Sequence, residues 1–97
     1  MPAYIILINW TQEGIKDVKQ SPDRLDKARS AFQAVGAELK ECFLVMGKYD
    51  LVVIAEAPDD ETIARLALTI GRKGATRTET LRAFTEGEYR KIIAALD

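Results

Sequence analysis

The sequence has no histidine, a single cysteine and only three prolines among its 97 residues. Because Cys42 is the only thiol, an intrachain disulfide is excluded, and without histidine a zinc or haem site built from the usual ligands is nearly excluded. We therefore expect no metal and no cofactor. The chain also lacks an apolar run near the roughly 20 residues of a membrane span, and it lacks the features of a signal peptide. We expect a cytoplasmic protein that does not bind membranes.

An excess of charge of either sign is also absent, since 14 basic and 15 acidic residues give a net charge of -1. Such a balance produces no overall field that would attract nucleic acid or an anionic membrane. The hydrophobic share of 47% and the charged share of 30% are typical of a globular protein. A chain of this length forms one domain with one core, which we expect to span residues 1–97.

Two apolar runs that flank a short turn with Gly47 organise the chain, and they predict a β-hairpin. The second run, residues 51–55, is apolar at every position, so both of its faces should be covered. It therefore predicts a central strand. Charged residues dilute the first run, residues 38–46, which predicts an edge strand.

The residues before the hairpin predict a strand and a long helix. Residues 3–10 form a continuous apolar run, which indicates a strand that is buried on both faces. Thr11 has the chemistry of a helix N-cap, but Gly14 weakens the following segment to a loop-like connection. Ser21, as N-cap before a proline, starts the first long helix, and Gly36 ends it in a left-handed conformation.

The residues after the hairpin predict a helix, an edge strand and a terminal helix. A proline and three carboxylates at residues 58–61 start the second long helix, which ends at residues 71–74. The threonine-rich segment 76–84 predicts the second edge strand. Thr85 and Glu88 have the spacing of a capping box. The helix that follows has an apolar stripe of Tyr89, Ile92, Ile93 and Leu96.

This order is β-α-β-β-α-β plus a C-terminal helix. It predicts an α+β fold, a ferredoxin-like sandwich whose antiparallel sheet has the strand order 4-1-3-2. The two apolar strands then lie in the middle of the sheet, which agrees with their composition.

Two helices cover only one face of such a sheet, although both central strands are apolar on both faces. A second copy of the same sheet is the more economical cover for the other face, so we expect a homo-oligomer, at least a dimer. The C-terminal helix could instead fold back over this face, or dock on the partner. The two sets of side chains are Ile5, Leu7, Val52 and Ile54 on one face, and Ile6, Ile8, Leu51 and Val53 on the other.

The turn of the hairpin reads Gly47-Lys48-Tyr49-Asp50, and residues 51–59 follow it. With these residues and the segment 78–84, nearly the whole chain resembles the GYD-domain proteins, a family without an established biochemical function. Lys48 separates Gly47 from Tyr49, so the match is to G-x-Y-D. The resemblance implies the fold of the dimeric α/β barrels and no particular mechanism.

Structural roles are the favoured interpretation of the motif. Gly47 serves the turn dihedral, Tyr49 packs its ring at the end of the sheet, and Asp50 accepts hydrogen bonds from turn amides. The functional alternative places Tyr49 and Asp50 at the mouth of a cleft, for binding or proton transfer.

A loop of even length would place Asp50 on one face of the sheet together with two further carboxylates, which are pocket candidates although edge solvation explains them equally well. An odd loop would reverse that assignment. Aromatic residues near the cleft favour a small apolar or aromatic ligand. The full set of motif and pocket candidates is Gly47, Tyr49, Asp50, Trp10, Glu41, Phe43 and Glu56.

Three functions remain open at this point. The first is an oligomeric module that binds or senses a small molecule. The second is a cofactor-independent enzyme of the dimeric barrel type, either monooxygenase-like or tautomerase-like with Pro2 as the base. The third is a structural or protein-interaction subunit. Cys42 is interpreted as a small buried hydrophobe, and residues 71–74 with Arg77 as a solvated connection and not as a phosphate site.

Overall fold

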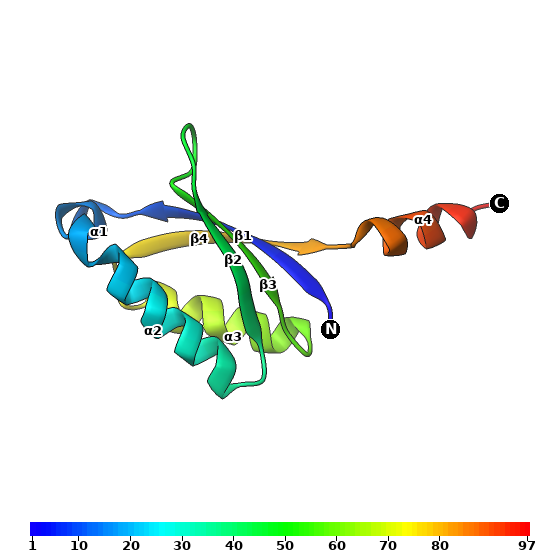
Figure 1. The fold of residues 1–97 in the computed structure, drawn as a ribbon, viewed down its shortest axis with the longest axis horizontal. Coiled ribbons are helices and arrows are strands. Elements are labelled where there is room, and N and C mark those ends of the chain that lie inside the picture. Colours follow the sequence, from blue (N-terminus) through cyan, green and yellow to red (C-terminus); the bar gives the residue numbers. More distant parts are fainter.

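A four-stranded antiparallel sheet with two long helices against one face is the frame of the protein, in a computed structural model that describes residues 1–97 (Figure 1). The α+β element order agrees with the prediction. The strands are β1 (Ala3–Trp10), β2 (Glu38–Leu44), β3 (Leu51–Glu56) and β4 (Thr76–Ala83). The helices are α1 (Gln12–Lys16), the 3-10 turn η1 (Val18–Gln20), α2 (Ser21–Ala34), α3 (Asp60–Gly71) and α4 (Glu86–Ala94).

The strand order is β2-β3-β1-β4, which is the predicted order 4-1-3-2 counted from the other edge. Every neighbouring pair is antiparallel. The two strands that are apolar at nearly every position, β1 and β3, therefore lie in the middle, and the more polar β2 and β4 lie at the edges. The ferredoxin-like fold is confirmed.

The helix boundaries differ from the prediction at two places. Ser21 is not an N-cap, because η1 runs directly into α2 and gives Ser21 helical dihedrals. The segment after β1 is a short helix, α1, which Thr11 caps through Gly14 N. A Cβ on Gly14 would lie 2.0 Å from the carbonyl oxygen of Ala75, so glycine permits the close approach of these two segments.

The core lies between the sheet and helices α2 and α3. Tyr4 and Ile6 of β1 and Val53 and Ala55 of β3 have at most 6% of their surface exposed. From the helices they meet Phe32, Ile63 and Leu66. The buried hydroxyl of Tyr4 donates a hydrogen bond to Asp60 Oδ1 at 2.5 Å, which satisfies the one polar atom of this side chain.

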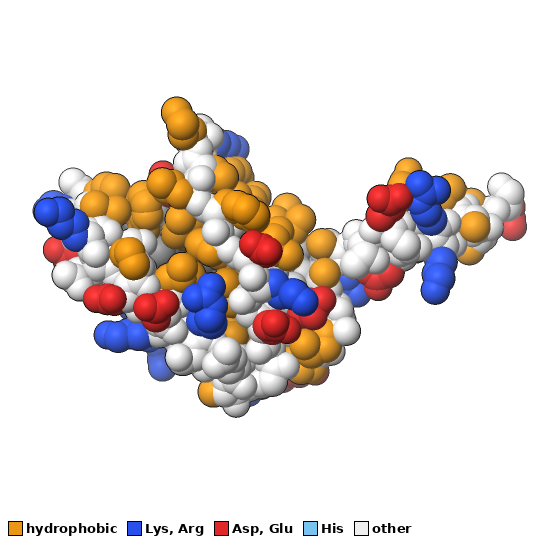
Figure 2. Space-filling model, viewed as in Figure 1, with side chains coloured by type: hydrophobic (Ala, Val, Ile, Leu, Met, Phe, Trp, Pro, Cys, Tyr) orange, Lys and Arg blue, Asp and Glu red, His pale blue; other side chains and the backbone are white.

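The other face of the sheet, here called the open face, has no helix over it. Ile5 pairs with Ile54 and Leu7 with Val52, as the separation into two side-chain sets predicts. All four remain partly exposed, and the edge strands add Phe43 and Leu81, which are exposed. Figure 2 shows apolar side chains gathered over the sheet and the hairpin.

Helix α4 extends away from the rest of the molecule (Figure 1). It has no extensive packing contact with any other element, and the principal extents of the chain are 52 × 31 × 18 Å. The alternative that the C-terminal helix folds back over the open face is therefore not what this structure shows. None of the helices is both long and apolar enough to span a membrane.

Candidate functional site

A cleft of about 720 Å³ lies at the end of the open face where β1 ends, β4 begins and the hairpin turns. Ligand pockets generally have volumes of roughly 300–1,000 Å³, so the size is suitable for a small molecule. The lining is mostly polar, with three hydrophobic residues among ten: Leu7, Asn9, Trp10, Thr11, Gln12, Lys48, Tyr49, Arg77, Thr78 and Glu79.

Asp50 fixes the hairpin turn against the end of β1. Its backbone N–H donates to the carbonyl of Ile8 at 2.9 Å, and its carboxylate accepts from the backbone N–H of Trp10 at 2.9 Å. Its own carbonyl accepts from Val45 N–H at 2.9 Å, which closes the base of the loop. Asp50 is thus engaged in backbone hydrogen bonds, but the amide that donates to its carboxylate belongs to the end of β1 and not, as the structural interpretation predicts, to the turn.

Gly47 supplies the conformation that the turn needs. Its φ of 120° lies in the region that side-chain-bearing residues avoid, and the site of a Cβ would be open space. The motif glycine therefore serves the backbone and contacts no neighbour.

Tyr49 stands beside Asp50 and crosses the sheet. Its hydroxyl donates to the carboxylate of Glu79 on β4, at 3.2 Å from Oε1. Because β1 lies between β3 and β4, this contact spans two strand spacings of about 4.8 Å each, so the side chain crosses β1 near Leu7, which pairs with Glu79. The ammonium of Lys48 lies 5.8 Å from the centroid of the Tyr49 ring. Tyr49 is therefore a wall of the cleft.

The opposite wall is held by Thr11. Its hydroxyl donates to the carbonyl of Gly74 at 2.5 Å, and its backbone N–H donates to the carbonyl of Ala75 at 3.0 Å. These bonds tie the start of α1 to the connection before β4, with Gly74 at a φ of 88°. Segments that are distant in sequence thus contribute the walls of the cleft, and hydrogen bonds connect them.

The charges of the cleft are unevenly satisfied. Glu79 accepts a hydrogen bond from Tyr49, whereas Lys48 and Arg77 take part in none of the ion pairs of the structure. Lys48 contacts only the ring face described above. The cleft therefore has two cations, Lys48 and Arg77, and one carboxylate, Glu79, so it can accommodate an anionic group of a ligand. Tyr49 and Glu79 are the groups of the cleft that could exchange a proton.

Two buried polar atoms at this end of the sheet lack a hydrogen-bond partner: Nε1 of Trp10 and Oγ1 of Thr76. The two residues face each other across β1 and β4. Most buried polar atoms in proteins have a hydrogen-bond partner. These two side-chain atoms, close to the cleft, are exceptions.

The seven sequence candidates separate into three groups. Trp10 and Tyr49 line the cleft, and Gly47 and Asp50 shape the turn beside it. The loop of residues 45–50 has even length, so the face assignment made for an even loop holds, and Phe43 faces Val52. The remaining candidates share the open face but lie outside the cleft: Glu41, Phe43 and Glu56.

Glu56 lies at the far end of β3, where it pairs with Ala3 and has Lys40 Nζ at 3.9 Å. Pro2, the tautomerase-like candidate, precedes Ala3, and its carbonyl accepts from Ala57 N–H at 3.2 Å. Both are at the opposite end of β1 from Trp10. A site that combined either of them with Tyr49 is therefore not formed within one chain.

Space between the sheet and its own helices is small. The apolar void there, bordered by Ile6, Leu25 and Phe32 among others, has a volume of about 80 Å³. A cavity that holds one benzene molecule measures about 150 Å³, so the apolar interior between the sheet and the helices is too small for such a ligand. A groove of about 710 Å³ lies outside the core, between α3 and the start of β4, and Leu68, Arg72 and Arg77 are among the residues that line it.

Cys42 and Tyr4 have the character of core groups. Cys42 is partly buried against the core, and burial raises the pKa of its thiol despite the nearby Arg29. Burial, and next the hydrogen bond to Asp60, raise the pKa of Tyr4 to about 12. Neither group lines the cleft.

Sequence reasoning did not place Glu79, Asn9 or Lys48 at the site. The strand order is the signal that could have located these residues, because it places the start of β4 beside the end of β1. The pairing of Asn9 with Arg77 and of Leu7 with Glu79 then follows from the register, which composition alone leaves undetermined. Arg77 was weighed only with residues 71–74, and those residues do not line the cleft.

A sequence model of the GYD domain matches residues 4–93. The protein named "Glutamine synthetase and cystathionine beta-lyase binding protein" from Thermus thermophilus is 31% identical over 84 residues, which are 86% of this chain and 88% of the relative. A solved structure from the same organism is similar at 25% identity and a TM-score of 0.55, over 88% of this chain and 95% of that one.

A feast or famine regulatory protein from M. tuberculosis, solved in complex with L-methionine, has a TM-score of 0.67 at 15% identity. The match covers 88% of this chain and 51% of that protein, so this chain spans about half the length of the regulator. At this level of identity the likeness shows the shared fold alone.

Proposed function

The chain is a member of the GYD-domain family, and we propose that it is a homo-oligomeric module that binds or senses a small molecule in the cleft beside Tyr49. The observation that carries this proposal is the cleft of about 720 Å³ next to the hairpin motif, walled by three separate segments. The motif residues Gly47 and Asp50 build the turn, and Tyr49 is the motif side chain that reaches the ligand space.

The homo-oligomer follows from the open face. Ile5, Leu7, Val52 and Ile54 lie on one side of the two central strands without any helix over them. Each such side chain is worth roughly 1.5–3 kcal/mol when fully buried, and contiguous apolar patches of this kind mark interaction sites. A second copy of the same face is apolar in the same way, so two copies pack as a two-fold pair.

The cleft favours a ligand that combines an apolar part with an anionic group. Leu7 and the ring of Tyr49 offer apolar surface, and Lys48 with Arg77 offer cations that take part in no ion pair. Arginine binds carboxylate or phosphate through paired N–H donors. The ligand is thus more polar than the small apolar or aromatic compound expected from the sequence. The fold neighbour with bound L-methionine supports small-molecule binding by this scaffold.

A thermal-shift screen of the purified protein against a metabolite library tests the proposal. A compound at 100 times its Kd stabilises the folded protein by about 2.7 kcal/mol, and we expect the stabilising compounds to carry a carboxylate or phosphate. Arg77→Ala should lose that shift. Arg65→Ala removes an exposed arginine on α3, outside the cleft, and should retain it. Equal shifts in both variants would contradict a ligand at this cleft.

A second candidate function is a protein-binding subunit, and the name of the Thermus thermophilus relative favours it. If that is the role, no compound in the library stabilises the protein, and purified glutamine synthetase or cystathionine beta-lyase forms a complex with it. Size-exclusion chromatography of the mixtures distinguishes the two functions, because small-molecule binding alone leaves each enzyme in its own peak.

A further inference from the structure

We propose that α4 is an arm that docks on a second copy of this chain through its apolar stripe. The stripe consists of Tyr89, Ile92, Ile93 and Leu96, whose exposed fractions are 58%, 47%, 50% and 67%. This inference rests on the homo-oligomer of the proposed function and adds a second contact to it, separate from the open face and from the cleft.

The sequence encodes α4 as a definite helix although it has no extensive packing contact with any other element of its own chain. Thr85 Oγ1 accepts from Glu88 N–H at 3.2 Å, and Glu88 Oε1 accepts from Thr85 N–H at 2.8 Å, so the capping box is complete. The hydrogen bond from the backbone N–H of Thr85 to the Glu88 carboxylate also lowers the pKa of Glu88. A helix of nine residues is nevertheless marginal in water without a packing partner. The stripe is therefore the part that needs a cover.

The connection before α4 is short, and contacts at both of its residues favour the direction in which the arm leaves the sheet. Only Phe84 and Thr85 separate β4 from α4. The Arg82 guanidinium lies 4.6 Å from the Phe84 ring centroid and 5.7 Å from that of Tyr4, and Arg82 Nε is 4.0 Å from Asp60 Oδ1.

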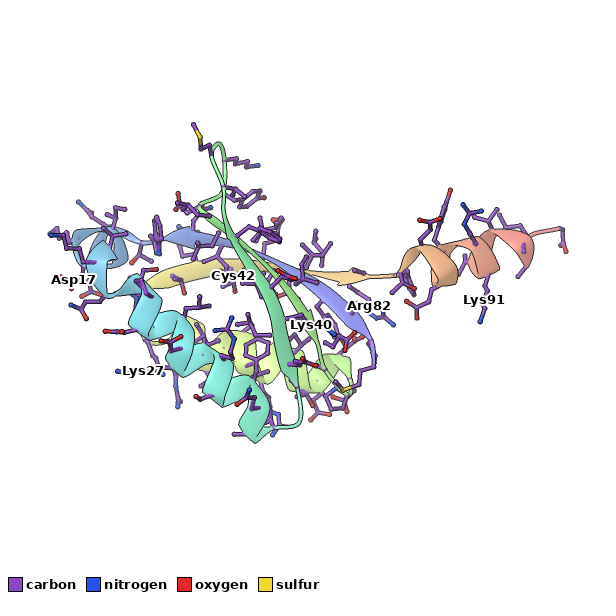
Figure 3. All side chains as sticks on the ribbon, viewed as in Figure 1. Asp17, Lys27, Lys40, Cys42, Arg82 and Lys91 are labelled. Carbon is purple, nitrogen blue, oxygen red and sulfur yellow. The ribbon has the colours of Figure 1, made fainter.

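Figure 3 shows Arg82 close to the point where the chain leaves the sheet, and Lys91 on the distant arm. Phe84 contacts Arg82 and Thr85 belongs to the capping box, so both residues of the connection have contacts that depend on the present direction of the chain. Folding back would break one of these two sets of contacts.

The solvent-accessible surface area of the chain is larger than that of a compact monomer of the same mass. The chain exposes 6814 Å², whereas a folded monomer of 10.8 kDa exposes about 5,500 Å² by the usual scaling with mass. The radius of gyration is 14.6 Å, against about 12.5 Å for a compact chain of this length. The excess of about 1,300 Å² is larger than the roughly 800 Å² that each partner buries in a standard interface.

A second copy is the occupant that fits this excess. Each copy exposes both an open face and an arm, and the arm begins directly after β4, an edge of the open face. A partner seated on the open face therefore lies next to the base of the arm, and two-fold symmetry lets each arm reach the other copy. The charged residues of α4 include two acidic and two basic side chains, Glu86, Glu88, Arg90 and Lys91, which provide no net charge for an anionic membrane.

Hydrogen exchange of the full chain at two concentrations tests the arm. We expect the α4 amides to exchange at least about tenfold more slowly at tens of micromolar than after dilution to the monomer. The double variant Ile92→Asp/Ile93→Asp should lose this protection. The double variant Arg90→Ser/Lys91→Ser, which changes charged positions of the same helix, should keep it, and β1 amides report whether the body of each variant folds.

Protection that does not depend on concentration would show that the arm folds on its own chain and would overturn the inference. Fast exchange at all concentrations in a protein that light scattering shows to be oligomeric would overturn it as well, while leaving the proposed function intact. A monomeric mass at tens of micromolar would instead reject the homo-oligomer of the proposed function, and the arm with it.

Discussion

The two faces of the sheet are built from the same kinds of residues and have opposite surroundings. On the helix-covered face, Val53 and Ala55 have exposed fractions of 2% and 0%. On the open face the neighbouring Val52 and Ile54 remain partly exposed, and Phe43 reaches 50%. Isoleucine, leucine and valine on a solvated face contribute little to the stability of the lone chain, and this difference between the faces is what the proposed homo-oligomer would account for.

The largest effect should come from Val53→Asp, which tests the covered face. The substitution places a carboxylate in a site that is 2% exposed and has apolar neighbours. Leaving a charge buried without a partner costs about 3–5 kcal/mol or more, which is a large share of the stability of a small domain. We expect the variant to be unfolded at 25 °C, as measured by circular dichroism. A cooperative thermal transition close to that of the wild type would show that this face is not the core.

The next effect should come from Ile54→Asp, one residue along the same strand. Its side chain is on the open face, so in the lone chain a carboxylate there keeps access to water. We expect a folded protein whose mass by light scattering falls to that of a monomer. Leu68→Asp is the matched control, because Leu68 is an exposed leucine on α3 at 73%, and it should leave the mass unchanged. An oligomer that survives Ile54→Asp would mean that the interface lies elsewhere.

The sequence was sufficient for the fold because two independent signals agreed. Apolar residues at successive positions indicate that β1 and β3 are central, and the element order is typical of a fold with the same arrangement. The separation of Ile5 from Ile6, or of Val52 from Val53, then follows from the period of two along a strand.

The site was only partly predictable, and the reason is register. Tyr49 and Trp10 were found because they adjoin a recognisable turn and a strand end. Glu79 and Arg77 reach the cleft through the pairing of β4 with β1, and a shift of one residue would put both on the other face. The direction of α4 was also open, since the capping box specifies how the helix begins and not what it packs against.

A smaller effect is expected at the buried Tyr4, whose hydroxyl marks the rim of the covered face. Its pKa is raised from 10.0 to about 12 in the folded protein, so below pH 10 the hydroxyl is protonated in both states and its contribution is fully present. Between about pH 10 and 12 the unfolded chain loses the proton first, and stability falls as the pH rises.

Tyr4→Phe isolates this contribution. The variant should lose about 1–2 kcal/mol at pH 8, because the hydrogen bond to Asp60 is removed, and the gap to the wild type should narrow above pH 10. Urea denaturation at pH 8 and pH 10.5 measures both quantities. A gap that stays constant across this range would show that Tyr4 titrates as an exposed tyrosine does.

The smallest effect on stability is expected for Tyr49→Phe, which asks whether the open face carries a binding site at its end as well as an interface. The change removes only the hydroxyl, whose partner Glu79 is exposed and regains water, so we expect a loss below about 0.5 kcal/mol. The ring, and with it the contact to Lys48, remains.

If the cleft binds a ligand, the thermal shift that the ligand produces should be smaller in Tyr49→Phe, because the hydroxyl no longer holds Glu79 in place at the wall of the cleft. Glu61→Gln, an exposed carboxylate on α3 outside the cleft, should keep the full shift. A stability loss near 2 kcal/mol with an unchanged ligand shift would make Tyr49 a packing residue of the turn, and the two faces would then differ in cover alone.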